Sequence, residues 1–200
     1  MFTGIIEALG QIAESEAIGG DCRMLITAPA AVPHGAQLGD SIAVNGVCLT
    51  AVEFRDNGFV ADLSAETLTA TTAKSWAVGR AVNLERALTP SKPLGGHLVL
   101  GHVDGVGRLL KKFEEARSWR MSFEVPKELA RYIARKGSIC IDGVSLTVNE
   151  VSATTFGVNI VPHTLTHTTL GQLKEGDAVN LEVDQIARYL ERLLAAREQA

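Results

Sequence analysis

The sequence has few of the features that would mark a disulfide-bonded, membrane-bound or nucleic-acid-binding protein. Its 200 residues include only three cysteines, with neither a CxxC spacing nor a paired Cys/His ligand pattern. Such a set argues against a disulfide framework and a zinc site, and it favours a reducing cytoplasm. No apolar run is long enough to cross a bilayer, and the N-terminus lacks a basic segment ahead of an apolar one. We therefore expect no membrane association and no signal peptide.

Charge and nucleotide-loop motifs are also sparse. The formal net charge is −4 and the basic residues are scattered, which argues against nucleic acid as a partner. The sequence has no Walker motif, nucleophile elbow or HExxH motif, and "GVGRLL" lacks the third glycine of a dinucleotide-binding loop. His97 and His102 are five residues apart, which on a strand puts them on opposite faces, so we expect no metal there.

The sequence does contain an internal repeat. "AVNGVCLT" at 43–50 returns as "CIDGVSLT" at 140–147, an offset of 97 residues. At this offset residues 1–85 align with 98–182 without a gap, and about 24 of the 85 pairs are identical, against roughly 6% expected by chance. The prolines and glycines of 86–97 mark a linker. Two explanations remain open: duplication for stability alone, or two like modules that bind two like molecules.

Each repeat has the pattern of a small antiparallel β-barrel. Short β-branched runs flank Asn45-Gly46 and Asp142-Gly143, and such dipeptides supply the two positive-φ residues of a type I′ hairpin turn. Further short strands, twice over, predict two barrels in tandem. An amphipathic C-terminal helix is predicted from the helical spacing of Ile186, Tyr189, Leu190, Leu193 and Leu194. The predicted domains are 1–97, 98–184 and the helix at 185–200.

The differences between the repeats carry more information than the identities. Cys48 aligns with Ser145, Ile5 with His102, Asn45 with Asp142 and Gly39 with Lys136. Each difference alone has an ordinary explanation, since a lone cysteine is usually a small core residue and an aspartate before glycine is usually a turn former. Together they indicate two modules that bind similar molecules in different roles.

Several segments resemble one known family. "MFTGII", "VNGVCLT", "GGHLVLGHVDG", "IDGVSLT", "HTLTHTTLG" and "VNLEVD", in this order, are similar to the riboflavin synthases of the trimeric type, which carry two lumazine-binding repeats. The resemblance covers essentially the whole chain. It implies an all-β fold of two tandem six-stranded Greek-key β-barrels followed by a C-terminal α-helix that joins three subunits. It also implies an active site between the first barrel of one subunit and the second barrel of a neighbour.

The implied reaction is a dismutation of two 6,7-dimethyl-8-ribityllumazine molecules, one donating and one accepting a four-carbon unit. The products are riboflavin and 5-amino-6-(D-ribitylamino)uracil, and no cofactor is implied. Because the substrate is used twice in one turnover, a repeated module fits this chemistry. Association with lumazine synthase is a further partner to consider. The main alternative is a non-catalytic lumazine- or flavin-binding chromophore protein; a flavin oxidoreductase barrel is a weaker one, because no nicotinamide-binding domain follows.

The resemblance also implies a set of site residues. In the first barrel these are Phe2, Gly4, Ile5, Ile6, Ser41, Cys48, Leu49, Thr50, Asp62, Leu63, Ser64, Ala65, Glu66 and Thr67. In the second they are Gly101, His102, Val103, Lys136, Asp142, Ser145, Leu146, Thr147, Ile160, Val161, Pro162, His163, Thr164, Leu165 and Asp184, with His97 in the linker. We expect most to bind substrate, and a catalytic role for Ser41, Cys48, His102, Lys136, Asp142, Ser145 and Thr147.

The implied reaction needs residues that align the two substrates, remove a proton and supply a nucleophile. The anion of the C7 methyl of the lumazine delocalises into the ring, so stacking two heterocycles in register should supply much of the catalysis. For removal of the methyl proton we favour His102 with Ser41. A nucleophile must add to the acceptor ring, for which Cys48, Ser145, or a water held by Asp142 and Lys136 are candidates. Which barrel holds the donor stays open.

Overall fold

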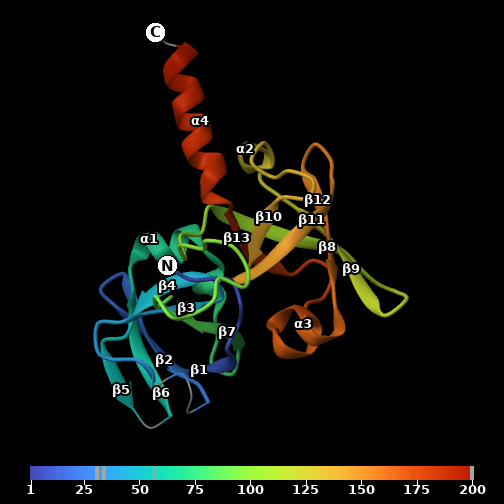
Figure 1. Ribbon diagram of the computed structural model, residues 1–200. Helices are drawn as coiled ribbons and strands as arrows, with labels where there is room; N and C mark the ends of the chain where they lie inside the picture. The colour runs from blue at the N-terminus through green and yellow to red at the C-terminus, as the bar shows by residue number, and fades with distance from the viewer. Residues whose placement is uncertain (30–31, 33–34, 56, 199–200) are drawn as a thin grey trace.

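The computed structural model describes all residues except 30–31, 33–34, 56 and 199–200, and its two repeats are built alike (Figure 1). The first consists of strands β1 (Ala8–Ile18), β2 (Asp21–Thr27), β3 (Ser41–Val44), β4 (Val47–Thr50), β5 (Glu53–Arg55), β6 (Gly58–Leu63) and β7 (Ala81–Arg86). Helix α1 (Ala65–Ala70) and the 3₁₀ helix η2 (Thr72–Ser75) lie between β6 and β7.

The second repeat follows the same order. Its elements are β8 (Gly105–Glu115), β9 (Ser118–Glu124), α2 (Lys127–Ala130), β10 (Ser138–Ile141), β11 (Val144–Val151), β12 (Thr155–Ile160), α3 (Pro162–His167), η3 (Thr169–Gln172) and β13 (Ala178–Val183). Nearly every boundary lies 97 residues after its counterpart, so the offset found in the sequence is also the offset of the fold.

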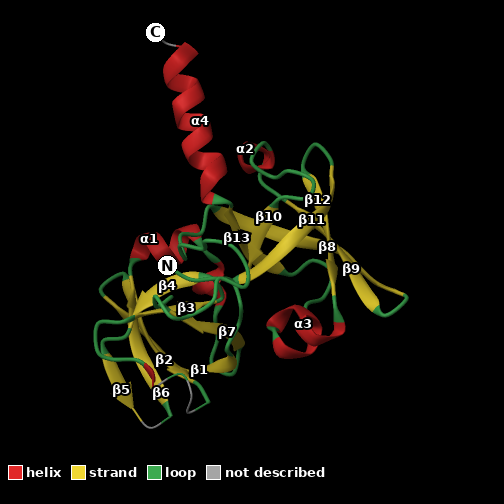
Figure 2. Cartoon of the chain, viewed as in Figure 1, coloured by secondary structure: helices red, strands yellow, loops and turns green. Residues whose placement is uncertain are grey.

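Both repeats form a barrel-like sheet (Figure 2), and their strands have the same neighbour order. The second is closed in the order β10-β11-β12-β9-β8-β13. The first has the order β4-β3-β7-β1-β2-β6-β5, which is the same circuit with the counterpart of β11 broken into β4 and β5. The predicted all-β fold of two tandem barrels with a C-terminal helix is therefore confirmed.

The two predicted hairpins are also confirmed. Asn45 and Gly46 have φ angles of 44° and 76°, and Asp142 and Gly143 have φ angles of 45° and 83°. Two successive positive φ values define the type I′ turn, whose twist matches that of the strands it joins. The turns fix the register of β3 on β4 and of β10 on β11.

Each barrel has its own apolar core, and a third cluster lies between them. The first core includes Ile42 and Phe59, while in the second the rings of Phe123 and Phe156 stack with centroids 5.6 Å apart. The cluster between the barrels contains Phe2, Ala43, Val99 and Cys140. Burial of each large apolar side chain stabilises the fold by about 1.5–3 kcal/mol.

The C-terminal helix α4 (Gln185–Glu198) projects away from both barrels (Figure 1). Asp184 caps it by accepting the N–H of Ile186 at 3.0 Å. Its polar side contacts the second barrel, where Arg188 pairs with Asp104 at 2.6 Å and Glu191 with Arg131 at 2.9 Å. Its apolar stripe is exposed. No helix in the described part of the chain is long and apolar enough to cross a membrane.

Candidate active site

The two barrels meet across an approximate two-fold axis. The equivalent side chains of Asn83 and Asn180 lie at the centre of this interface. The Nδ2 group of Asn83 donates to the carbonyl oxygen of Asp142 at 2.8 Å, and that of Asn180 donates to the carbonyl oxygen of Asn45 at 2.9 Å. Their amide oxygens accept the first N–H of η3 and of η2. Each contact has a counterpart 97 residues away, which is the reciprocal pattern of a two-fold interface.

Each repeat sends its N-terminal segment across to the other barrel. We call residues 2–6 arm 1 and residues 99–103 arm 2. The backbone N–H of Ser145 donates to the carbonyl oxygen of Gly4 at 2.8 Å, and that of Cys48 donates to the carbonyl oxygen of Gly101 at 2.9 Å. Ile6 packs against the second core and Val103 against the first. Residues 4–6, grouped with the first barrel from the sequence, thus also contact the second, and residues 101–103 also contact the first.

A buried carboxylate holds each arm in place. Glu85 accepts the N–H groups of Thr3 and Gly4 at 2.8 and 2.9 Å, and the hydroxyl of Thr3 at 2.6 Å. Glu182 accepts three successive N–H groups of arm 2, from residues 100, 101 and 102, at 2.7 to 3.0 Å. Burial raises the pKa of Glu182, and the three N–H donors and nearby Arg188 oppose this shift. Charge-assisted bonds of this kind fix backbone position strongly.

Beside each arm lies a strand segment that pairs with a neighbouring strand on one side only. β4 pairs with β3 but not with β6, and β11 pairs with β12 only from Val148 onward. We call 47–50 the first edge and 144–147 the second edge. Because backbone groups alternate in direction along a strand, Thr50 and Thr147 direct their N–H and C=O groups the same way as Cys48 and Ser145. Such an edge can pair with the alternating donors and acceptors of a pyrimidinedione.

The first edge combines residues from both repeats. Cys48 is half-buried beneath arm 2, since a Cβ placed on Gly101 would lie 2.6 Å from the Cβ of Cys48. Ser41 lies opposite Thr50 in the register of β3 and β4. His102 is exposed at the end of arm 2. Among the described residues, the side chains of His102 and Ser41 form no hydrogen bond with each other, so their pairing as a base stays a prediction.

The second edge carries a different polar pair. The Nδ1 atom of His97 and the hydroxyl oxygen of Ser145 are 2.6 Å apart. Burial lowers the pKa of His97 below its usual value, and the charge of nearby Asp184 opposes this only partly. His97 is therefore neutral at pH 7. Its Nε2 atom is buried and has no hydrogen-bond partner among the described residues.

Three predicted site residues lie elsewhere. Phe2 is fully buried in the cluster between the barrels, so its ring is a core residue and does not line a surface. Asp142 is also buried, and its Oδ1 accepts the N–H of Asn180 at 2.8 Å. Lys136 is exposed at the opposite end of β10 from Asp142. Their six-residue separation spans about 20 Å along a strand, so these two side chains cannot hold one water between them.

The segments after β6 and β12 form the short helices α1 and α3. Leu63 and Ile160 belong to the barrel cores, as does Leu49, while Leu146 and Leu165 pack on the second core from outside. Asp62 points outward and pairs with Arg23 at 2.7 Å, which lowers the pKa of Asp62. Ser64 caps α1 by accepting the N–H of Thr67 at 3.2 Å. The remaining predicted residues here are exposed or half-buried: Ala65, Glu66, Val161, Pro162, His163 and Thr164.

Sequence reasoning missed the residues that build the interface and hold the arms. Asn83, Glu85, Asn180 and Glu182 were not predicted as site residues, although "VNLE" is identical in both repeats. The signal was a polar pair inside an otherwise apolar strand. A buried asparagine or glutamate needs hydrogen-bond partners. Here the asparagines bind backbone groups of the other barrel, and the glutamates bind backbone groups of the arms.

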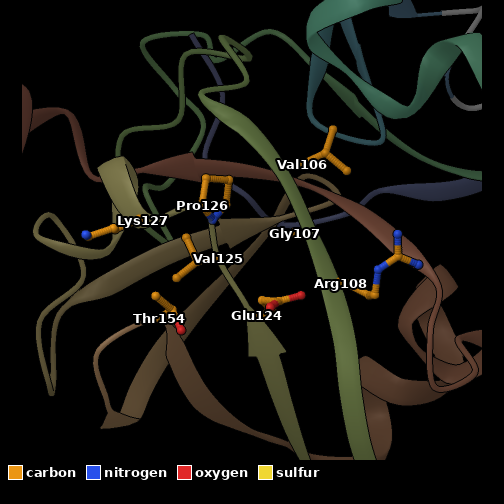
Figure 3. A pocket seen from close by; sticks show the side chains of 8 residues that line it. All are labelled: Val106, Gly107, Arg108, Glu124, Val125, Pro126, Lys127 and Thr154. Carbon is orange, nitrogen blue, oxygen red and sulfur yellow. The ribbon is translucent and has the colours of Figure 1, made fainter.

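A surface hollow occurs on the second barrel, but it lies apart from both edges. It has a volume of about 410 Å³ and is lined by Val106, Gly107, Arg108, Glu124, Val125, Pro126, Lys127 and Thr154 (Figure 3). None of these is a predicted site residue. A second hollow lined by residues 9–11 and 27–29 lies at the equivalent place on the first barrel. The hollows are therefore a property of the repeat.

Comparison with known proteins decides the family. The model of the lumazine-binding domain matches residues 3–87 and 100–184. The riboflavin synthase of Photobacterium phosphoreum is 46% identical, covering 97% of this chain and 89% of its own. That of Mycobacterium bovis is 44% identical, covering 97% and 98%. The chain belongs to the riboflavin synthase family.

Solved structures show the same double barrel. LumP complexed with riboflavin has a TM-score of 0.86 and 29% identity, covering 92% of this chain and 99% of that one. LumP complexed with 6,7-dimethyl-8-(1′-D-ribityl) lumazine has a TM-score of 0.84 and 28% identity. The identity to riboflavin synthases is clearly higher than to LumP, which supports an enzyme of the riboflavin synthase type.

Proposed function

We propose that this riboflavin synthase family member joins two molecules of 6,7-dimethyl-8-ribityllumazine, giving riboflavin and 5-amino-6-(D-ribitylamino)uracil. The observation that carries the proposal is the pair of strand edges with matching backbone and different side chains. The first edge has Cys48 under arm 2, and the second has Ser145 paired with His97. Two similar edges can bind two copies of one substrate, and different side chains can give the copies different roles.

Two groups of residues can carry out the proton transfers of this reaction. His97 is neutral and its Nδ1 lies 2.6 Å from the hydroxyl oxygen of Ser145, so with its own proton on Nε2 it can take the proton of Ser145. His102, exposed beside the first edge, is the alternative base. Cys48 or Ser145 is available to add to the acceptor ring. No step needs a cofactor, because carbon and electrons only pass between two copies of one molecule.

Assembly would bring the two substrates together. Within one chain the arms lie against the two edges at Cys48 and Ser145, and each edge ends on an exposed threonine, Thr50 or Thr147. Two flat heterocycles can stack only if an edge of one chain faces the other kind of edge in a second chain. The exposed apolar stripe of α4 supplies a contact surface, which supports a homotrimer through this helix. The three unpaired cysteines fit a cytoplasmic enzyme.

A direct assay tests the function against the carrier alternative. The protein is incubated with 6,7-dimethyl-8-ribityllumazine alone, and riboflavin is followed by fluorescence while the uracil product is separated and quantified. A riboflavin synthase consumes two lumazines for each riboflavin and each uracil formed. Stoichiometric binding without riboflavin formation would instead support a chromophore carrier, the kind of ligand binding that the LumP structures display.

A further inference from the structure

The two arms are tied down by different parts of the chain. Each arm is followed by an acidic residue at an equivalent position, Glu7 after arm 1 and Asp104 after arm 2. Glu7 is bound by Lys92 of the linker at 2.7 Å and by Arg86 at 2.8 Å. Asp104 is bound by Arg188 of α4 at 2.6 Å. Lys92 and Arg188 both come from the segment that follows the last strand of their repeat, but only Arg188 lies on the helix.

Arg188 also reaches the backbone of arm 2. Its Nη2 atom donates to the carbonyl oxygen of His102 at 3.0 Å, and its positive charge opposes the raised pKa of Glu182. The side chains of Arg188 and Asp104 are only 29% and 17% exposed, so solvent weakens this contact less than it weakens a surface ion pair. Asp104 in turn accepts the N–H of Val183, the last residue of β13, at 2.8 Å.

Arm 2 covers the first edge. Its Gly101 accepts the N–H of Cys48, and its Val103 packs into the first core. A change in the position of α4 can therefore reach Cys48 through a short series of contacts, from Arg188 to His102 and from Gly101 to Cys48. Arm 1, which covers Ser145, is fixed by Lys92 and Glu85 of its own repeat and its linker.

We infer that Arg188 is a positioning residue that couples the C-terminal helix to the first edge. The helix position thereby controls how firmly arm 2 covers Cys48, whereas Lys92 does the same for arm 1 and Ser145 without the helix. The inference rests on the proposed function only where turnover is concerned. It gives the first turn of α4 a role in the site itself, in addition to any contact between subunits.

The reactivity of the Cys48 thiol measures how firmly arm 2 covers it, and no substrate is needed for this measurement. Cys22 and Cys140 are 9% and 1% exposed, whereas Cys48 is half-buried under the arm. Its rate of reaction with Ellman's reagent, in excess over protein, should rise about five- to tenfold in Arg188→Met, since a charge-assisted contact that holds the arm is lost. Arg188→Lys should recover part of the protection, because a lysine can restore the charge but not the guanidinium geometry.

Two matched variants make the experiment decisive. Lys92→Met removes the equivalent tie of arm 1 and should leave the Cys48 rate within about twofold of the parent protein. Asp104→Asn should also raise the rate at which the Cys48 thiol reacts. Combining it with Arg188→Met should raise that rate little further, because both changes break the same ion pair. Sedimentation and thermal unfolding on the same samples show whether assembly and stability are kept.

The outcomes separate the coupling from the function. A Cys48 rate unchanged in Arg188→Met, or raised equally in Lys92→Met, would overturn the inference even if every variant makes riboflavin. Turnover should show a lower kcat with a smaller change in KM in Arg188→Met, with partial rescue by Arg188→Lys. If the parent protein binds lumazine but makes no riboflavin, the proposed function fails while the thiol result still stands.

Discussion

At the scale of single residues, Asp142 shows how a difference between repeats can be structural. It occupies the position of Asn45, and each side chain accepts a backbone N–H from the last strand of its own barrel, Asn180 at 2.8 Å and Asn83 at 2.7 Å. Burial raises the pKa of Asp142 to about 7, well above the 3.8 of an unfolded chain. The protonated form of this carboxyl is therefore favoured by burial. At alkaline pH the folded chain must hold a buried carboxylate without a cationic partner among the residues that the structure describes.

This difference predicts a pH-dependent stability. Between pH 4 and 7 the folded state holds a proton on Asp142 that the unfolded state does not, so stability falls as pH rises across this range and levels off above pH 7. Asp142→Asn should remove this dependence and stabilise the protein at pH 8 by up to about 4 kcal/mol. Urea unfolding at pH 6 and pH 8 measures it. The mirror change Asn45→Asp should create a second such dependence; equal pH slopes in all three proteins would contradict this account.

Ser145 and His97 give a second prediction at this scale. Removing either member should lower turnover by about 100-fold or more, as expected for loss of a general acid–base pair. The double variant Ser145→Ala with His97→Gln should be little worse than either single one, because the two groups act as a unit. Ser138→Ala, on the neighbouring strand, serves as the control and should remain active. Fully additive losses would show that the 2.6 Å contact has no joint role.

At the scale of elements, the barrels could be predicted but the arms could not. The Asn-Gly and Asp-Gly turns, the period of the strands and the 97-residue offset are local signals, and each was confirmed. The exchange of arms depends on contacts between the repeats, in which the N–H of Ser145 donates to Gly4 and that of Cys48 to Gly101. The same segments could have closed on their own barrels, because both repeats offer equivalent edges. No local pattern in Gly4 or Gly101 distinguishes these arrangements.

The carboxylate of Glu182 is the part of this arrangement that a single change tests best. Glu182→Gln keeps the volume but turns an NH₂ group toward backbone N–H donors that need an acceptor. We expect a loss of about 1–3 kcal/mol in the free energy of unfolding and a fall in turnover, since arm 2 carries His102. Glu150→Gln, an exposed change in the same barrel, is the control for urea unfolding. Identical midpoints for the two variants would show that Glu182 does not anchor the arm.

At the scale of the whole molecule, the polar and apolar sides of α4 have different partners. Arg188 and Glu191 bind the second barrel, which explains why the predicted stripe remains uncovered within one chain. Ile186, Tyr189 and Leu193 are 63%, 70% and 64% exposed. A stripe of this size on a well-anchored helix is typical of a surface that packs on other copies of the chain. The sequence predicted the stripe, but only the structure shows that the barrels leave it free.

Assembly and turnover should therefore be lost together when the stripe is charged. Burying one leucine contributes about 1.5–3 kcal/mol, so placing a carboxylate at Leu193 in every subunit should dissociate the assembly. Sedimentation of Leu193→Glu should give monomers that still bind riboflavin at their strand edges, while turnover falls at least about tenfold because no second edge faces the first. Arg192→Glu adds negative charge to the same helix outside the stripe and should remain assembled and active. Monomers of Leu193→Glu with full turnover would place both substrates within one chain and remove the need for facing subunits.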